Sequence, residues 1–207
     1  MAGYGLKSTL AGLAILASGV VASGGVANAS VVFDDGATNY TGAYRSAGTL
    51  STSFSATAGS NAISFDLFGA NSVDGFGNGY DDLFTVALNG VDVFAGYFNM
   101  SGGGANLVTL NTLGWTAATV TNPGGYFYGG VTSVSGLASL LGGSNSFAVT
   151  FTQPGPYNGG GQDTGDESWA LNKLDISPAA VPLPAAAPLL LAGLGGLAAL
   201  RRKRKVG

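Results

Sequence analysis

The sequence contains neither cysteine nor histidine among its 207 residues. These absences exclude Cys and His nucleophiles, His bases and Ser-His-Asp triads, together with zinc, haem and iron–sulfur sites built on Cys or His ligands. They also exclude disulfide bonds. A fold exported from the cell would therefore be stabilised by core packing or by an ion with oxygen ligands.

Charged residues are also scarce, at 9% of the chain against ~25% in typical soluble domains. Five of the eight basic residues lie between positions 201 and 205. Between Ser30 and Ala180 there are two basic and eleven acidic residues, which gives this region a net charge of −9. Because such a region repels nucleic acid, we expect no nucleic-acid partner.

Residues 1–29 have the pattern of a secretory signal peptide. Lys7 provides the basic start, and an apolar segment runs from Leu10 to Val21. Ala27 and Ala29 form a small-residue cleavage signal, which leaves Ser30 as the mature N-terminus. The twelve residues of the apolar segment are too few to span a hydrocarbon core of ~30 Å. We therefore expect this segment to be removed by signal peptidase.

Residues 181–207 have a different, three-part pattern. A proline-containing motif is followed by an uncharged run of eighteen residues, 183–200, and then by a basic cluster. The run is just long enough to cross a bilayer as a helix, and the positive-inside rule keeps the basic cluster in the cytoplasm. The pattern also fits a plain C-terminal membrane anchor. The motif consists of Val181, Pro182, Leu183, Pro184 and Ala185, and the basic cluster consists of Arg201, Arg202, Lys203, Arg204 and Lys205.

These three parts, in this order, resemble the VPLPA-CTERM variant of PEP-CTERM sorting domains over residues 181–205. The resemblance implies recognition by an exosortase, an integral-membrane enzyme similar to a cysteine transpeptidase. It also implies cleavage near the proline motif, so that the protein contacts the inner membrane only transiently. The product would reach the surface or extracellular matrix of a Gram-negative cell. The commoner form of the motif has Glu at the position of Leu183.

The region between the two signals predicts β-structure. Residues 62–67 and 146–151 alternate apolar and polar side chains, the pattern of strands with one buried face. Residues 83–95 predict a β-hairpin, because Asn89-Gly90 is the strongest signal for a type I′ turn. This pairing places Phe94 on the side opposite the buried face. The predicted buried face consists of Phe84, Val86, Leu88, Val91, Val93 and Ala95.

Short strands separated by Gly-rich turns predict an all-β fold. We expect a single jelly-roll-like antiparallel β-sandwich over residues 30–180, flanked by the signal peptide and the C-terminal hydrophobic helix. One short helix is expected at 135–141, with Ser135 as its N-cap, and a long exposed loop at 153–166. Further strands are expected at 31–33, 50–56, 106–110, 116–121, 126–128 and 169–176.

Residues 64–96 and 166–177 resemble a loosely defined group of domains carried by PEP-CTERM proteins. Relatives commonly read W-x-x-D-N near the end, where this chain has Asn172 and Lys173. The resemblance implies a likeness to carbohydrate-binding jelly rolls, without identifying a sugar-binding residue.

The loop at 74–82 carries four candidate ligands for Ca²⁺, namely Asp74, Asn78, Asp81 and Asp82. Hard oxygen ligands on a flexible Gly-rich turn suit this ion, although the spacing does not match an EF-hand. The same residue types also form ordinary turns, so both interpretations stay open.

A second group of acids would come together if the first and last strands are neighbours, as they often are in a jelly roll. Solvated surface acids are the alternative. This group consists of Asp34, Asp35, Asp163, Asp166 and Glu167.

Six aromatic residues are of the type that stacks on a sugar, but we expect Trp115 and Trp169 to belong to the core instead. Tyr157, in the exposed loop, is the best candidate for a glycan contact. The six are Tyr80, Trp115, Tyr126, Tyr128, Tyr157 and Trp169.

These features together predict a non-catalytic exported protein of the cell surface or of an exopolysaccharide matrix. Its partners would be signal peptidase and an exosortase during export, and exopolysaccharide afterwards. The alternatives are a module that binds a defined glycan and a plain membrane-anchored protein. The sequence contains no recognisable set of catalytic residues, so we do not expect an enzyme.

Overall fold

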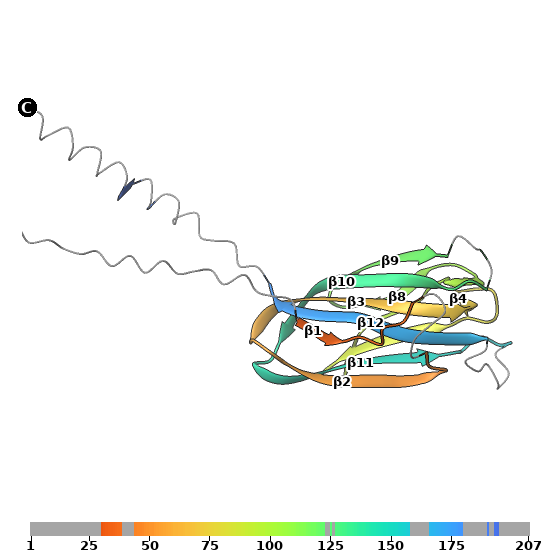
Figure 1. Ribbon diagram of the computed structural model, residues 1–207, viewed down its shortest axis with the longest axis horizontal. Coiled ribbons are helices and arrows are strands. Elements are labelled where there is room, and N and C mark those ends of the chain that lie inside the picture. The colour runs from red at the N-terminus through yellow and green to blue at the C-terminus, as the bar shows by residue number, and fades with distance from the viewer. Residues whose placement is uncertain are drawn as a thin grey trace, which may run out of the picture.

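The protein folds as two five-stranded antiparallel sheets packed as a sandwich (Figure 1). The computed structural model describes residues 30–38, 44–122, 125, 127–157, 166–179, 190 and 193–194. The predicted all-β sandwich is confirmed. The strands are β1 (Ser30–Phe33), β2 (Gly48–Ala56), β3 (Gly59–Asn71), β4 (Val73–Asp74), β5 (Leu83–Leu88), β6 (Val91–Tyr97), β7 (Ser101–Gly103), β8 (Leu107–Asn111), β9 (Thr116–Thr121), β10 (Gly130–Leu140), β11 (Gly143–Thr152) and β12 (Glu167–Pro178).

The two sheets have the strand orders β1–β12–β3–β10–β9 and β2–β11–β5–β6–β8. The paired strands within each sheet run antiparallel. β4 and β7 form a separate short parallel ladder beside them. β12 lies between β1 and β3, so the first and last strands are neighbours, as the sequence suggested.

The core between the sheets is dominated by aromatic rings. Phe84, Phe151 and Trp169 are fully buried. The ring centroid of Phe84 lies 4.8 Å from that of Phe151 and 5.9 Å from that of Trp169. Phe65 and Trp115 extend this cluster, with their centroids 6.0 Å apart. Burial of each large side chain contributes roughly 1.5–3 kcal/mol. The expectation that Trp115 and Trp169 belong to the core is confirmed.

The predicted hairpin is present between β5 and β6. Asn89 and Gly90 have φ angles of 51° and 77°, and a type I′ turn requires a positive φ at both positions. Leu88 pairs directly with Val91 across the turn. The two central residues of the turn therefore set the register of the hairpin, as the sequence predicted.

The predicted faces of this hairpin are wrong for two residues. A β-bulge separates the pair Ala87–Asp92 from the pair Val86–Phe94, so β6 contains one extra residue. Phe94 therefore faces the core and is fully buried, whereas Val91 beside the turn is 64% exposed. A strict period of two does not hold across a bulge.

Two local predictions in the second half of the chain are also wrong. Residues 135–140 continue strand β10 rather than forming a helix, and Ser135 pairs with both Ser64 and Thr116. Pairing with β3, which continues to Leu140, outweighs the weak helical preference of this segment. Residues 127–128 lie in a turn instead of a strand.

The first and last residues of the sandwich lie side by side at the same end of the fold. Ser30, which begins β1, pairs with Ile176 near the end of β12. Glu167, which begins β12, pairs with Asn71 at the opposite end. In Figure 1 the beginning of β1 and the end of β12 lie at the same side of the sandwich. A site near Glu167 is therefore at the far end from both termini of the sandwich.

Several sequence predictions lie outside the described residues. These are the signal peptide with Ala27 and Ala29, the sorting motif at 181–185 and the basic cluster at 201–205. Within the part of the chain that the structure describes, no helix has the length and apolar character needed to cross a membrane.

Candidate functional site

The candidate site lies where the chain crosses from one sheet to the other, between β3 and β5. Asp74 ends the short strand β4, and Asp82 immediately precedes β5. Glu167 begins β12, which is paired with β3. Because β3 leads into β4, this pairing brings the last strand of the fold beside the loop at 74–82.

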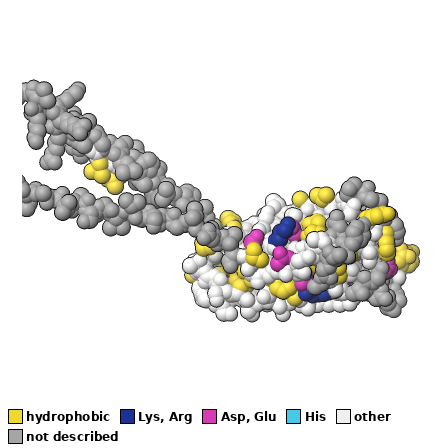
Figure 2. All heavy atoms as spheres, viewed as in Figure 1, with side chains coloured by type: hydrophobic (Ala, Val, Ile, Leu, Met, Phe, Trp, Pro, Cys, Tyr) yellow, Lys and Arg dark blue, Asp and Glu magenta, His cyan; other side chains and the backbone are white. Residues whose placement is uncertain are grey.

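Three carboxylates converge at this junction. Asp74, Asp82 and Glu167 each offer an oxygen atom, and these oxygens lie within 4.8 Å of one another. The three residues are only 4%, 0% and 1% exposed, respectively. On the face drawn in Figure 2, other charged side chains appear as isolated acidic and basic spots on a mostly uncharged surface.

Hydrogen bonds hold each of the three carboxylates in place. The backbone N–H of Asp74 donates to Oδ2 of Asp82 at 2.7 Å. The side-chain amide of Asn78 donates to Oδ1 of Asp74, and that of Gln153 donates to Oε2 of Glu167. Oδ1 of Asp82 has no hydrogen-bond partner among the described residues.

Burial changes the proton affinity of this cluster. Desolvation, followed by the nearby charge of Asp82, raises the pKa of Glu167 to about 9. Desolvation also raises the pKa of Asp82 to about 7, with the charge of Asp74 adding to the effect. The pKa of Asp74 is raised as well, mainly by burial. Each shift has the same origin, since negative charge here is poorly solvated and faces further negative charge.

Glycine is required at position 102 beside this cluster. A Cβ atom there would lie 2.4 Å from Oδ1 of Asp74 and 2.3 Å from the carbonyl oxygen of Ser72. Only a residue without a side chain allows β7 to approach the Asp74 carboxylate so closely.

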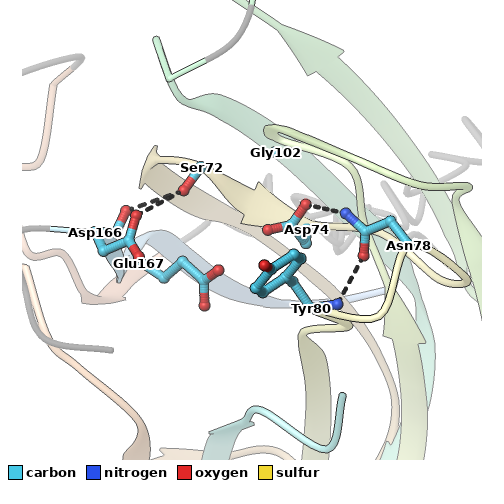
Figure 3. A pocket seen from close by; sticks show the side chains of 7 residues that line it. All are labelled: Ser72, Asp74, Asn78, Tyr80, Gly102, Asp166 and Glu167. Atoms are coloured by element: carbon cyan, nitrogen blue, oxygen red, sulfur yellow. Dashed lines mark hydrogen bonds between the residues drawn. The ribbon is translucent and has the colours of Figure 1, made fainter. Parts of the chain in front are cut away.

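A polar pocket of about 340 Å³ opens directly beside Asp74 and Glu167 (Figure 3). In the figure the side chains of Asp74, Tyr80 and Glu167 lie close together across it, with Asn78 bonded to Asp74. Asp82 is fully buried and is not part of the pocket wall. The wall is formed by Ser72, Asp74, Asn78, Tyr80, Gly102, Asp166 and Glu167.

Of the four predicted Ca²⁺ ligands, three lie at the carboxylate cluster and one stabilises the loop. Asp74 and Asp82 come together, and Asn78 is hydrogen-bonded to Asp74. Asp81 lies outside the group of three carboxylates, and its Oδ1 accepts the backbone N–H groups of Gly77 and Gly79 at 2.7 and 3.3 Å. Asp81 therefore shapes the loop.

The four described members of the second predicted acid group do not assemble as one cluster. Asp34 accepts the backbone N–H of Gly36. Asp35 forms an ion pair with Arg45 and accepts the backbone N–H of Leu171. The carboxylate of Asp35 is thus neutralised by the guanidinium group of Arg45, ten residues further along the chain.

The acids at the beginning of β12 have separate partners. Asp166 accepts a hydrogen bond from the hydroxyl of Ser72 at 3.1 Å, and Glu167 joins Asp74 and Asp82. Asp163 is outside the described residues. The sequence therefore predicted the wrong neighbours for Glu167, and it predicted no role for Gln153. Glu167 reaches the loop because β12 pairs with β3, and this pairing could have been anticipated only from the order of the strands in the sheet.

The candidate glycan contact lies next to the same pocket. Tyr157 is 66% exposed, and its ring centroid is 5.6 Å from that of Tyr80 on the pocket wall. The backbone N–H of Tyr157 donates to the carbonyl of Gly79. Two exposed rings therefore border an acidic pocket at the end of the sandwich that is remote from both of its termini.

Comparison with protein-family models, with curated proteins and with solved structures finds no match for this chain.

Proposed function

We propose that this chain is an exported, non-catalytic protein of the cell surface or extracellular matrix, processed at its C-terminus by an exosortase. The observation that carries the proposal is the placement of an export signal and a three-part sorting signal on either side of one β-sandwich. Signal peptidase acts at Ala29, and the exosortase acts near the motif at 181–185. The protein thus passes through the inner membrane and ends at the surface or outside the cell, in contact with exopolysaccharide.

The positions of the sandwich termini support this route. Ser30 and Ile176 are paired, so both processing points are connected to the same end of the sandwich. While the precursor is anchored by its C-terminal segment, the opposite end points away from the bilayer. That end carries the acidic pocket and Tyr157.

A jelly-roll arrangement for the sandwich is supported by its strand order. One sheet contains the four-strand set β1–β12–β3–β10, and the other contains the set β2–β11–β5–β6. Within these sets the chain changes sheet at every step except between the hairpin strands β5 and β6, as it does when a pair of Greek keys is wrapped into a barrel-like sandwich.

The burial of the carboxylates supports a role without catalysis. A glycosidase must place a sugar between two carboxyl groups ~5–10 Å apart. Asp82 is fully buried and is not part of the pocket wall, and the oxygens offered by Asp74 and Glu167 lie within 4.8 Å of each other, closer than such a pair.

Intact-mass measurement of the protein recovered from its own cells tests the proposed route. We expect a species that begins at Ser30 and ends between residues 181 and 185. Replacing both Pro182 and Pro184 with Ala should leave the C-terminal segment attached in the membrane fraction. Pro178→Ala, just outside the motif, is the matched control and should be processed normally. Recovery of the intact wild-type tail in the membrane would contradict the proposal and favour a plain anchor.

A second candidate function, recognition of a defined glycan, is favoured by the ring pair Tyr80–Tyr157 beside the pocket. Exposed aromatic rings provide flat apolar surfaces with a polar edge, which suits the faces of sugar rings. Binding of the full chain to a glycan array tests this function. Selective binding that is lost in Tyr157→Ala but kept in Tyr128→Ala, where the ring is 47% exposed, would support it. Unselective or absent binding would contradict it.

A further inference from the structure

The buried carboxylate cluster has no compensating cation in the surrounding sandwich. The only two basic residues between positions 30 and 180 are Arg45 and Lys173. Arg45 forms an ion pair with Asp35, and Lys173 forms an ion pair with Asp66 at 3.2 Å. Burying several carboxylates without a counter-charge is strongly unfavourable. The site is therefore neutralised either by bound protons or by a cation from solution.

Asp82 provides an independent indication of which of these neutralises the site. Its side chain is fully buried, and its Oδ1 accepts no hydrogen bond from any described residue. Native proteins rarely leave a buried polar atom without a partner, and a bound ion can supply the missing one. When all three carboxyl groups are ionised, the neighbours of this atom offer only further acceptors, because deprotonated carboxylates donate nothing.

We propose that Asp74, Asp82 and Glu167 bind one divalent cation of the Ca²⁺ type at the base of the pocket. The distances between the ligand oxygens fit this assignment. Two oxygens that each lie ~2.4 Å from a shared Ca²⁺ ion are at most ~4.8 Å apart. The three oxygen atoms lie within 4.8 Å of one another. Each ligand comes from a different segment of the chain, so the ion would join β4, the start of β5 and the start of β12.

The donor set favours Ca²⁺ over other metals. Every candidate ligand is a hard oxygen, and the chain has no thiolate or imidazole, which excludes the usual ligands of zinc and copper. Ca²⁺ accepts 6–8 oxygens in irregular geometry, whereas Mg²⁺ requires a nearly ideal octahedron. Asp74 and Glu167 also form part of the pocket wall, so water in the pocket can complete the coordination. The ion would therefore have an entry path.

Calorimetric titration and thermal unfolding of the full chain in detergent test this proposal. We expect Ca²⁺ to bind with one-to-one stoichiometry and, at a hundredfold excess over Kd, to raise Tm by roughly 5–10 °C over EDTA. Mg²⁺ at matched ionic strength should give a much smaller shift. Asp82→Asn and Glu167→Gln should each abolish the Ca²⁺ response.

The Tm of the two variants in EDTA distinguishes a loss of Ca²⁺ binding from a loss of folding. In EDTA each should melt at or above the wild-type Tm, because each replaces a buried carboxyl group, whose ionised form is poorly solvated, with an amide that stays neutral. Asp92→Asn is the matched control, since it removes one negative charge from an exposed position on β6, and it should keep the full Ca²⁺ response.

Two results would overturn the proposal. The first is the absence of Ca²⁺ binding by the wild-type chain, which would mean that the carboxylates are neutralised by shared protons instead. The second is an equal response to Mg²⁺, or an undiminished response in Asp82→Asn, which would indicate general screening of the −9 charge. Cation binding and terminal processing are measured separately, so either inference can fail without the other.

Discussion

Asn145 connects two turns at the end of the sandwich opposite to the acidic pocket. It is 3% exposed and makes four hydrogen bonds through its side chain. Its Nδ2 donates to the carbonyl oxygens of Leu141 and Gly143 at 2.9 and 3.0 Å. Its Oδ1 accepts from the backbone N–H of Leu141 at 3.1 Å and from Nδ2 of Asn89 at 2.9 Å. One side chain thus joins the β10–β11 turn to the β5–β6 turn.

Asn145→Ala removes these four hydrogen bonds at once. Each is worth ~0.5–1.5 kcal/mol net, which gives a total of roughly 2–6 kcal/mol. Leu141 is 63% exposed, so water replaces part of what is lost there. We therefore expect a loss of about 2–4 kcal/mol in the free energy of unfolding. For a chain of this size the corresponding drop in Tm is roughly 5–15 °C.

Urea unfolding of the full chain, followed by tryptophan fluorescence, measures this loss, because both tryptophans are buried in the core. Asn145→Asp should lose at least as much, since it places a carboxylate oxygen against the carbonyl oxygens of Leu141 and Gly143 in a buried position. Ser144→Ala, at the exposed neighbouring position, is the control and should change stability by less than ~0.5 kcal/mol. An Asn145→Ala variant as stable as that control would refute the reasoning.

Two further predictions concern the core and the carboxylate cluster. A Cβ at Gly136 would lie 2.1 Å from the ring of Trp115, so Gly136→Ala should lower stability by ~1–3 kcal/mol and shift the tryptophan emission. Gly142→Ala, where the nearest atom is 3.5 Å away, should change neither. The ion-free protein should lose stability as the pH rises from about 4 to 9, because the folded-state pKa values of Asp82 and Glu167 are raised to about 7 and about 9. The folded state then holds protons that the unfolded state releases. Melting curves in EDTA that are flat, or that rise with pH over this range, would contradict the second prediction.

The sequence predicted those parts of the fold that depend on local patterns. Alternation over 62–67 and 146–151 located the centres of β3 and β11, and Asn89-Gly90 located the hairpin turn. The bulge that turns Phe94 into the core was not predictable, because it depends on how β6 fits the opposing sheet rather than on its own pattern.

The candidate site was predictable only within one loop. Asp74 and Asp82 are close in sequence and were identified together, whereas Glu167 reaches them through the pairing of β12 with β3. Spacing also could not distinguish Asp82 from Asp81. The two are adjacent, yet one is fully buried in the cluster and the other binds the backbone of the loop.

The long strand β12 has a mechanical consequence if the protein is tethered at its C-terminus, as in the membrane-anchored precursor proposed above. β12 runs from Glu167 at the pocket end to Pro178 at the opposite end, and it is hydrogen-bonded to β3 along most of that length. A pull on a partner held at the pocket end would be transmitted along the axis of β12. Its ladder with β3 would then be loaded in shear, with many hydrogen bonds sharing the force, instead of being opened one bond at a time like a zipper.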